Sequence, residues 1–197
     1  MQRVGCPQGV CEAEDHAEKK TKRFREQKPE QVERYLAELA ECAGRPIVYV
    51  DETGIDTWLC REHGWSERGA PVVGEVCGRK YERVGVVAGL LGESVIEPYQ
   101  YGGTMESVFF EAWFEGRLLP ALPPNSVIVM DNASFHRKSR LPGLAERAGH
   151  RVLFLPPYSP ELNPIENYWS WLKRQLRKIL PGFLTFNDAL CSVFGGR

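Results

Sequence analysis

The sequence of 197 residues carries little excess charge and no long apolar run. Its 25 Lys and Arg residues nearly balance its 26 Asp and Glu residues, so the formal net charge is −1 and no global basic field indicates nucleic-acid binding. The longest nearly apolar run, Val84–Leu91, is far shorter than the roughly 20 residues that a membrane span needs. Met1–Val10 lacks the apolar segment of a secretory signal. We therefore expect a soluble, cytoplasmic protein without a membrane partner, in which any DNA contact depends on local patches.

Cysteine pairs with zinc-binding spacing are also absent. No two of the six cysteines are separated by only two residues, the spacing that closes a zinc knuckle. Cys6, Cys11 and His16 would supply three ligands, and Cys60 with His63 would supply two, but neither set has a recognisable complement. We therefore favour reduced, unligated thiols over a structural zinc site.

The composition that remains is that of a globular domain. Apolar residues make up 43% of the chain and charged residues 26%, which allows one domain with a buried core. The apolar periodicity predicts alternating helices and strands. Helices are expected over 29–39, between Thr104 and Pro120, over 134–148, over 163–179 and after a capping box at Thr185 and Asp188; strands are expected at 47–50, 72–73, 83–91, 95–96, 126–130 and 152–155.

Two of the predicted apolar strands end at an aspartate. Asp51 follows the strand at 47–50, and Asp131 follows the strand at 126–130. Burying a carboxylate at such a position is costly unless a cation or hydrogen bonds compensate. If the two strands are neighbours, both carboxylates emerge at the same edge of the sheet and can share a divalent cation, which prefers hard oxygen ligands.

Glu166 is the third candidate ligand, and it has two compatible interpretations. With Asn163 as the N-cap, Glu166 occupies the capping-box position and stabilises the start of a helix without any catalytic role. It also lies about 100° around that helix from the apolar face that includes Ile165, so its side chain points away from the core. A site of two carboxylate-bound Mg²⁺ ions supports phosphodiester displacement in nucleases and polynucleotidyl transferases.

The sequence around these acids forms three blocks. They are Tyr49–Gly54 (YVDETG), Met130–His136 (MDNASFH) and Leu155–Asn167 (LPPYSPELNPIEN), and 34 residues separate Asp131 from Glu166. The blocks and the spacing resemble the signature of mariner-type DDE transposases, in their bacterial insertion-sequence branch. The resemblance covers most of the chain, from about Lys19 to Asp188.

The resemblance implies an α/β, ribonuclease H-like fold with a mixed sheet flanked by helices. It implies that Asp51, Asp131 and Glu166 are the catalytic triad and bind Mg²⁺ or Mn²⁺, with two ions in the site. The implied activity is DNA cutting by water at the inverted-repeat ends of an insertion sequence, followed by joining of the freed 3′-hydroxyl to target DNA, typically at a TA dinucleotide. A homodimer on paired DNA ends is also implied.

Further residues of the blocks and their neighbourhood are candidates for supporting roles. Asn132, His136 and Asn163 would orient the substrate or the acids; the alternatives are that they hold a turn, begin a helix and cap a helix. Candidates for contact with the DNA backbone are basic residues after Asp131 and after Glu166, for which solvated helix faces are an equally good interpretation: Lys138, Arg140, Lys173, Arg174 and Arg177. We interpret four tryptophans as packing residues: Trp58, Trp65, Trp169 and Trp171.

These features predict three regions. A charged arm and an amphipathic helix occupy 1–45, the ribonuclease H-like catalytic domain occupies 46–180, and a short helix and tail occupy 181–197. The arm is interpreted as a solvated linker, with phosphate tracking as the alternative. Transposases of this type usually carry an N-terminal helix-turn-helix region that recognises the inverted repeats. We expect either a split reading frame with a separate helix-turn-helix half, or a truncated remnant.

Two rival functions remain open at this point. One is a catalytically silent transposase remnant or an accessory DNA-binding protein that keeps the fold. The other is a stand-alone ribonuclease H-like nuclease that acts on RNA hybrids or branched DNA. The intact acidic triad argues against the silent remnant, whereas the missing recognition domain argues for it; comparing hydrolysis of a hybrid with that of duplex DNA would distinguish the stand-alone nuclease.

Overall fold

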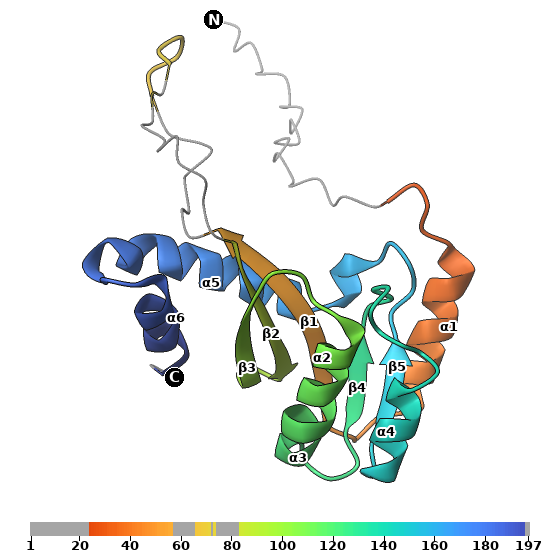
Figure 1. Cartoon of the computed structure of the whole chain (residues 1–197). Coiled ribbons are helices and arrows are strands. Elements are labelled where there is room, and N and C mark those ends of the chain that lie inside the picture. Colours follow the sequence, from red (N-terminus) through yellow and green to blue (C-terminus); the bar gives the residue numbers. More distant parts are fainter. Residues whose placement is uncertain (1–23, 57–65, 72, 74–82, 196–197) are drawn as a thin grey trace, which may run out of the picture.

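The structure, a computed structural model, describes residues 24–56, 66–71, 73 and 83–195. These residues form a five-stranded mixed sheet in the order β3-β2-β1-β4-β5 (Figure 1). The parallel strands are β1 (Ile47–Asp56), β4 (Val127–Met130) and β5 (Arg151–Phe154). The antiparallel strands are β2 (Arg83–Leu91) and β3 (Ser94–Gly102). Helices flank the sheet, in agreement with the predicted fold class.

The helices within the described residues are α1 (Pro29–Ala40), α2 (Ser107–Trp113), α3 (Leu119–Ala121), α4 (Leu141–Arg147), α5 (Ile165–Ile179) and α6 (Phe186–Gly195). A π-helical turn, Phe114–Leu118, joins α2 to α3. Short 3₁₀ turns precede and follow α5, at Pro160–Leu162 and Leu180–Gly182.

Side chains alternate between the two faces of the sheet, and each face contributes to its own apolar cluster. On one face, Met130 belongs to a cluster with Phe110 and other residues of α2, α3 and α4. On the other face, Ile55 of β1 belongs to a cluster with Trp169 and other residues of α5 and α6. Helix α1 packs beside β4 and β5 through the buried Tyr35. Strands β1 and β4 are therefore covered on both sides and form a fixed base for the side chains at their ends.

Strand β1 is longer than the strand predicted at 47–50. The expectation that Asp51 ends it is wrong, because antiparallel pairing with β2 continues from Asp51 to Asp56. The parallel pairing with β4 does stop at Val50 and Met130. Asp51 thus lies at the edge where the parallel strands end, while its backbone stays held in the sheet.

The predicted helix over 134–148 is observed only as α4. Pro142 lies in the first turn of α4, where a proline is tolerated; inside a helix that began at residue 134, its ring would clash with the preceding turn. Residues 134–140 form turns instead.

The helix starts differ in part from the predictions. Helix α2 begins with Glu106, not Thr104, at the cap position, and α5 begins with Pro164, not Asn163, at the cap position. The capping box before α6 is confirmed, because Thr185 Oγ1 accepts the N–H of Asp188 at 3.1 Å.

The structure also bears on the remaining strand predictions, on the membrane prediction and on the cysteines. The strands at 83–91 and 95–96 are confirmed as β2 and part of β3, while Val72 lies outside the described residues and Val73 is in no strand. Within the described ranges no helix is long and apolar enough to cross a membrane. Cys42 and Cys191 are free thiols. The zinc-ligand candidates all lie outside the described residues: Cys6, Cys11, His16, Cys60 and His63.

Candidate active site

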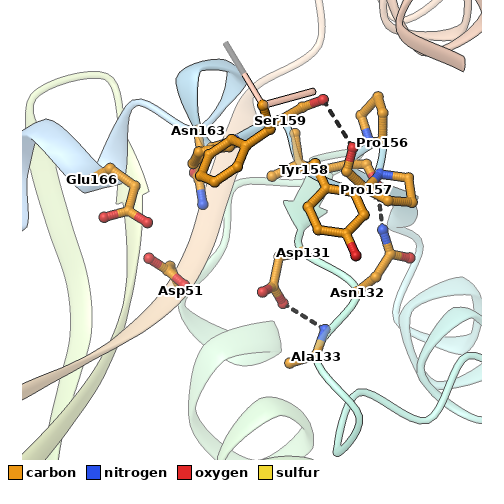
Figure 2. A pocket seen from close by; sticks show the side chains of 13 residues that line it. Asp51, Asp131, Asn132, Ala133, Pro156, Pro157, Tyr158, Ser159, Asn163 and Glu166 are labelled. Carbon is orange, nitrogen blue, oxygen red and sulfur yellow. Dashed lines mark hydrogen bonds between the residues drawn. The ribbon is translucent and has the colours of Figure 1, made fainter. Parts of the chain in front are cut away.

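The three predicted acids line one cavity. Asp51 is on β1, Asp131 follows β4, and Glu166 lies in the first turn of α5; together they line a cavity of about 390 Å³ (Figure 2). Figure 2 shows the carboxylates of Asp51 and Glu166 facing one another, with Asp131 across the cavity. Residues that are 115 positions apart in the sequence, from 51 to 166, are thus brought to one place.

The topology of the sheet explains why the acids meet. Parallel strands present their carboxyl ends at the same edge, and β1 and β4 stop pairing at Val50 and Met130, so the next residues are the two aspartates. From the neighbouring β5 the chain runs through Pro156–Pro160 into the turn before α5. That loop lines the same cavity and delivers Glu166 to it.

Asp51 is held in place by Trp169. The indole Nε1–H of Trp169 donates to Oδ2 of Asp51 at 3.0 Å, and both side chains are buried. Burial, together with the charges of Glu166 and Glu52, raises the pKa of Asp51 from 3.8 to about 8. Among the described residues, no positive charge contributes to this shift.

Asp131 is instead part of a network with a buried histidine. His136 Nδ1 lies 2.9 Å from Oδ1 of Asp131, and His136 Nε2 lies 3.1 Å from Oε1 of Glu52. Burial disfavours the imidazolium, but the hydrogen bonds to the two carboxylates outweigh it and raise the pKa of His136 to about 9. Burial likewise acts to raise the pKa of Asp131, but hydrogen bonds from His136 and from the N–H of Ala133 outweigh it and leave that pKa lowered. With this pKa, the His136 side chain is protonated at neutral pH and lies between the carboxylates of Asp131 and Glu52.

The donor set fits a divalent cation. Asp51, Asp131 and Glu166 offer hard carboxylate oxygens, and the described residues that line the cavity include no Lys or Arg. A cation bound beside Asp51 would offset the burial and the neighbouring carboxylates that raise its pKa. In the described part of the chain no three acidic, His or Cys side chains are already close enough to enclose an ion.

The two candidate asparagines occupy different positions. Asn132 Nδ2 donates to the carbonyl of Leu155, which ties the segment after Asp131 to the proline loop. Asn163 is 4% exposed and lines the cavity, and among the described residues its Oδ1 has no hydrogen-bond partner. Its side chain points into the cavity in Figure 2. Asn163 is thus available to a ligand rather than used as a helix cap.

The predicted DNA-backbone residues divide into three groups. Arg140 pairs with the buried Glu111 at 3.3 Å, beside an ion pair of Arg137 with the same carboxylate at 2.7 Å. Exposed Lys138 has its Nζ over the ring of Phe154, 5.1 Å from the centroid. On α5, Lys173 is half-buried, whereas two arginines are exposed: Arg174 and Arg177.

Sequence reasoning missed two residues of the site, Glu52 and Trp169. Glu52 follows Asp51 in a strand, so its side chain points to the opposite face, where it meets His136. The sequence predicts only a packing role for Trp169, and this role is confirmed. Its indole N–H also donates a hydrogen bond to Asp51, which the sequence does not indicate. The signal available was general: a buried Trp usually finds an acceptor for its N–H. Of the other tryptophans, Trp58 and Trp65 lie outside the described residues.

The protein has a ribonuclease H-like fold in which three carboxylates line one cavity, at the edge where two parallel strands stop pairing. Residues 46–184 match the family model described as DDE superfamily endonuclease, and the chain belongs to that family.

A curated protein of Sinorhizobium fredii, the uncharacterized protein y4pE/y4sA, is 32% identical over 104 residues, which are 53% of this chain and 65% of that protein. The Mos1 transposase paired-end complex with left transposon end is similar in structure, with a TM-score of 0.62 and 19% identity over 80% of this chain and 53% of that chain. The mariner Mos1 paired end complex with Mg matches with a TM-score of 0.60 and 16% identity, over 90% and 64% of the two chains. These likenesses confirm the ribonuclease H-like fold. The chain spans about half to two thirds of the length of these proteins.

Proposed function

We propose that this chain is the catalytic domain of a mariner-like transposase of a bacterial insertion sequence. It would cut DNA at the inverted-repeat ends and join the freed 3′-hydroxyl to target DNA, at a TA dinucleotide. The observation that carries this proposal is the convergence of Asp51, Asp131 and Glu166 on one cavity of a DDE-family fold. The similar Mos1 chains, by their descriptions, form transposon-end complexes and a strand transfer complex.

Asp51, Asp131 and Glu166 would hold two Mg²⁺ or Mn²⁺ ions, the metals named for two of the Mos1 complexes. When bound, such ions stabilise the attacking and leaving oxygens of phosphodiester displacement. The protein supplies the orientation of the carboxylates. Trp169 fixes Asp51, and His136 with the N–H of Ala133 fixes Asp131. Asp51, with its pKa of about 8, would release a proton when a cation binds.

The partners follow from the same proposal. We infer that the chain acts on DNA in the bacterial cytoplasm, at the nucleoid, as a homodimer on paired ends. Recognition of the inverted repeats would come from a helix-turn-helix half. Asn163, whose Oδ1 has no hydrogen-bond partner among the described residues, would orient the substrate or an acid.

The experiment that tests this function compares substrates. The purified chain and its Asp131→Ala variant are incubated with Mg²⁺ and either duplex DNA or an RNA–DNA hybrid. Cleavage of duplex DNA by the unmodified chain alone is the expected result. Preference for the hybrid would favour the stand-alone nuclease, and full activity of the variant would remove Asp131 from the mechanism.

A further inference from the structure

Two exposed aromatic rings stand at the mouth of the acidic cavity. Phe24 and Tyr158 both line it and are 48% and 56% exposed, whereas the other aromatic residues in the described part of the chain, except Phe183, are buried or half-buried. Their ring centroids lie 6.2 Å apart at an interplanar angle of 41°, so the rings are close without stacking on one another. In Figure 2 the ring of Tyr158 hangs into the cavity from its rim.

The backbone holds this pair in an unusual way. Tyr158 has a φ of 59°, in the left-handed region that a bulky residue rarely adopts. Such strain persists only where surrounding contacts fix it, and it gathers at functional sites. The fixing contacts come from Gln27, whose Nε2 donates to Oγ of Ser159 at 2.8 Å, to the carbonyl of Tyr158 at 3.4 Å and to the carboxylate of Glu161. The segment that carries Phe24 is thus attached to the loop that carries Tyr158.

Flat apolar rings beside a phosphodiester-cutting site suit one kind of ligand. Single-stranded nucleotides bind by stacking their bases on aromatic side chains, and every base has a face that can do so. Phe24 and Tyr158, which we call the aromatic rim, line the same cavity as Asp131 and Glu166. A nucleotide next to the phosphate at the acids would therefore reach the rings. A protein partner would need more apolar area than two rings provide.

We propose that Phe24 and Tyr158 bind an unpaired base of the DNA substrate, next to the phosphodiester that the acids cut. The aromatic rim thereby favours DNA whose strand is already open or flipped at that position. This inference rests on the proposed function, because it places the cut phosphate at the triad. It predicts tighter binding of DNA with an unpaired overhang than of the same duplex with blunt ends.

The test measures binding without cutting. Glu166→Gln is introduced in every protein so that the DNA stays intact, and fluorescence anisotropy gives Kd for an overhang duplex and for a blunt duplex. Tyr158→Gly removes the ring and suits the positive φ, Tyr158→Phe keeps the ring, and Phe24→Ala removes the second ring. We expect Tyr158→Gly and Phe24→Ala to weaken overhang binding roughly 5- to 100-fold, as loss of one stacked base does. Tyr158→Phe should bind the overhang duplex as tightly as the Glu166→Gln protein with Phe24 and Tyr158 unchanged. The Kd for the blunt duplex should stay within about twofold in all of these proteins.

A second readout places the base itself. 2-Aminopurine at the unpaired position should be quenched by the proteins that keep the Tyr158 ring and not by Tyr158→Gly. The proposal is overturned if Tyr158→Gly binds and quenches normally, if Tyr158→Phe fails as Tyr158→Gly does, or if the overhang gives no advantage to the unmodified rim. Failure of the proposed function is separate, because it is seen as absent metal-dependent cleavage by the chain with Glu166 intact.

Discussion

At the residue scale, the two aspartates carry opposite pKa shifts, so their substitutions should have opposite effects on stability. Asp51 has a folded pKa of about 8, above its usual value of 3.8. The folded state favours the protonated form of Asp51. Its contribution to the free energy of unfolding is therefore complete below about pH 4 and is lost as the pH rises through about 8. Asp131 has a lowered pKa, so its contribution is present at neutral pH and is lost as the pH falls through that folded pKa.

We therefore predict that Asp51→Asn stabilises the metal-free protein at pH 8, by about 2 kcal/mol or roughly 4 to 8 °C in Tm. The amide oxygen can still accept from Trp169, so the gain comes from removal of the buried charge. Asp131→Asn should lower Tm at neutral pH, although both variants lose cleavage. Thermal unfolding in EDTA over a range of pH checks this, and shifts of the same sign in both variants would contradict it.

Trp169 allows a further prediction at this scale. Trp169→Phe keeps most of the packing but removes the donor to Asp51, so metal affinity and cleavage should fall about 10- to 100-fold. Trp113→Phe is the matched control, because its indole N–H donates to the carbonyl of Glu97 away from the cavity, at 3.0 Å. Calorimetry with Mn²⁺ and plasmid nicking measure both variants. Equal losses in the two would indicate that Trp169 acts through packing alone.

At the element scale, ion pairs connect helix α2 to the segment that follows Asp131. The carboxylate of Glu111 is buried and pairs with Arg137 and Arg140. Glu111→Gln should lower the free energy of unfolding by about 1 to 3 kcal/mol, because two guanidinium groups lose their partner. Urea unfolding measures the change. Glu115→Gln is the control, since its pair with Arg147 is exposed and 3.8 Å long and should be worth less than about 1 kcal/mol.

Helix α5 carries the prediction for the DNA backbone. Arg174 and Arg177 are exposed, so replacing both by Gln should reduce the slope of log K against log salt by about 2. Arg140→Gln should leave the slope unchanged, because Glu111 already uses its charge. Binding of a fluorescent duplex over a range of salt concentrations gives these slopes. If Arg140→Gln reduced the slope as much as the double variant does, the DNA backbone would run past Arg140, after Asp131, rather than along α5 alone.

At the scale of the whole molecule, sequence pattern predicted the sheet and the acids better than their surroundings. Asp51 and Asp131 stood out because an acid after an apolar strand needs compensation, and parallel pairing does bring them to one edge. The extent of β1 was not predictable from apolar residues, because its pairing with β2 holds the polar positions from Asp51 onward. The contacts of Trp169 with Asp51 and of His136 with Glu52 join residues 118 and 84 positions apart, which periodicity cannot reveal.

The central claim is that Asp51, Asp131 and Glu166 form a working metal-dependent DNA-cutting site. The most direct measurement is plasmid nicking by the purified chain in Mn²⁺ or Mg²⁺, beside Glu166→Gln, which keeps the shape of the side chain and removes its charge. We predict nicking by the unmodified chain only, with weaker Mn²⁺ binding by the variant in calorimetry. Equal nicking by the two proteins, or a folded chain that neither binds metal nor cuts DNA, would contradict the account.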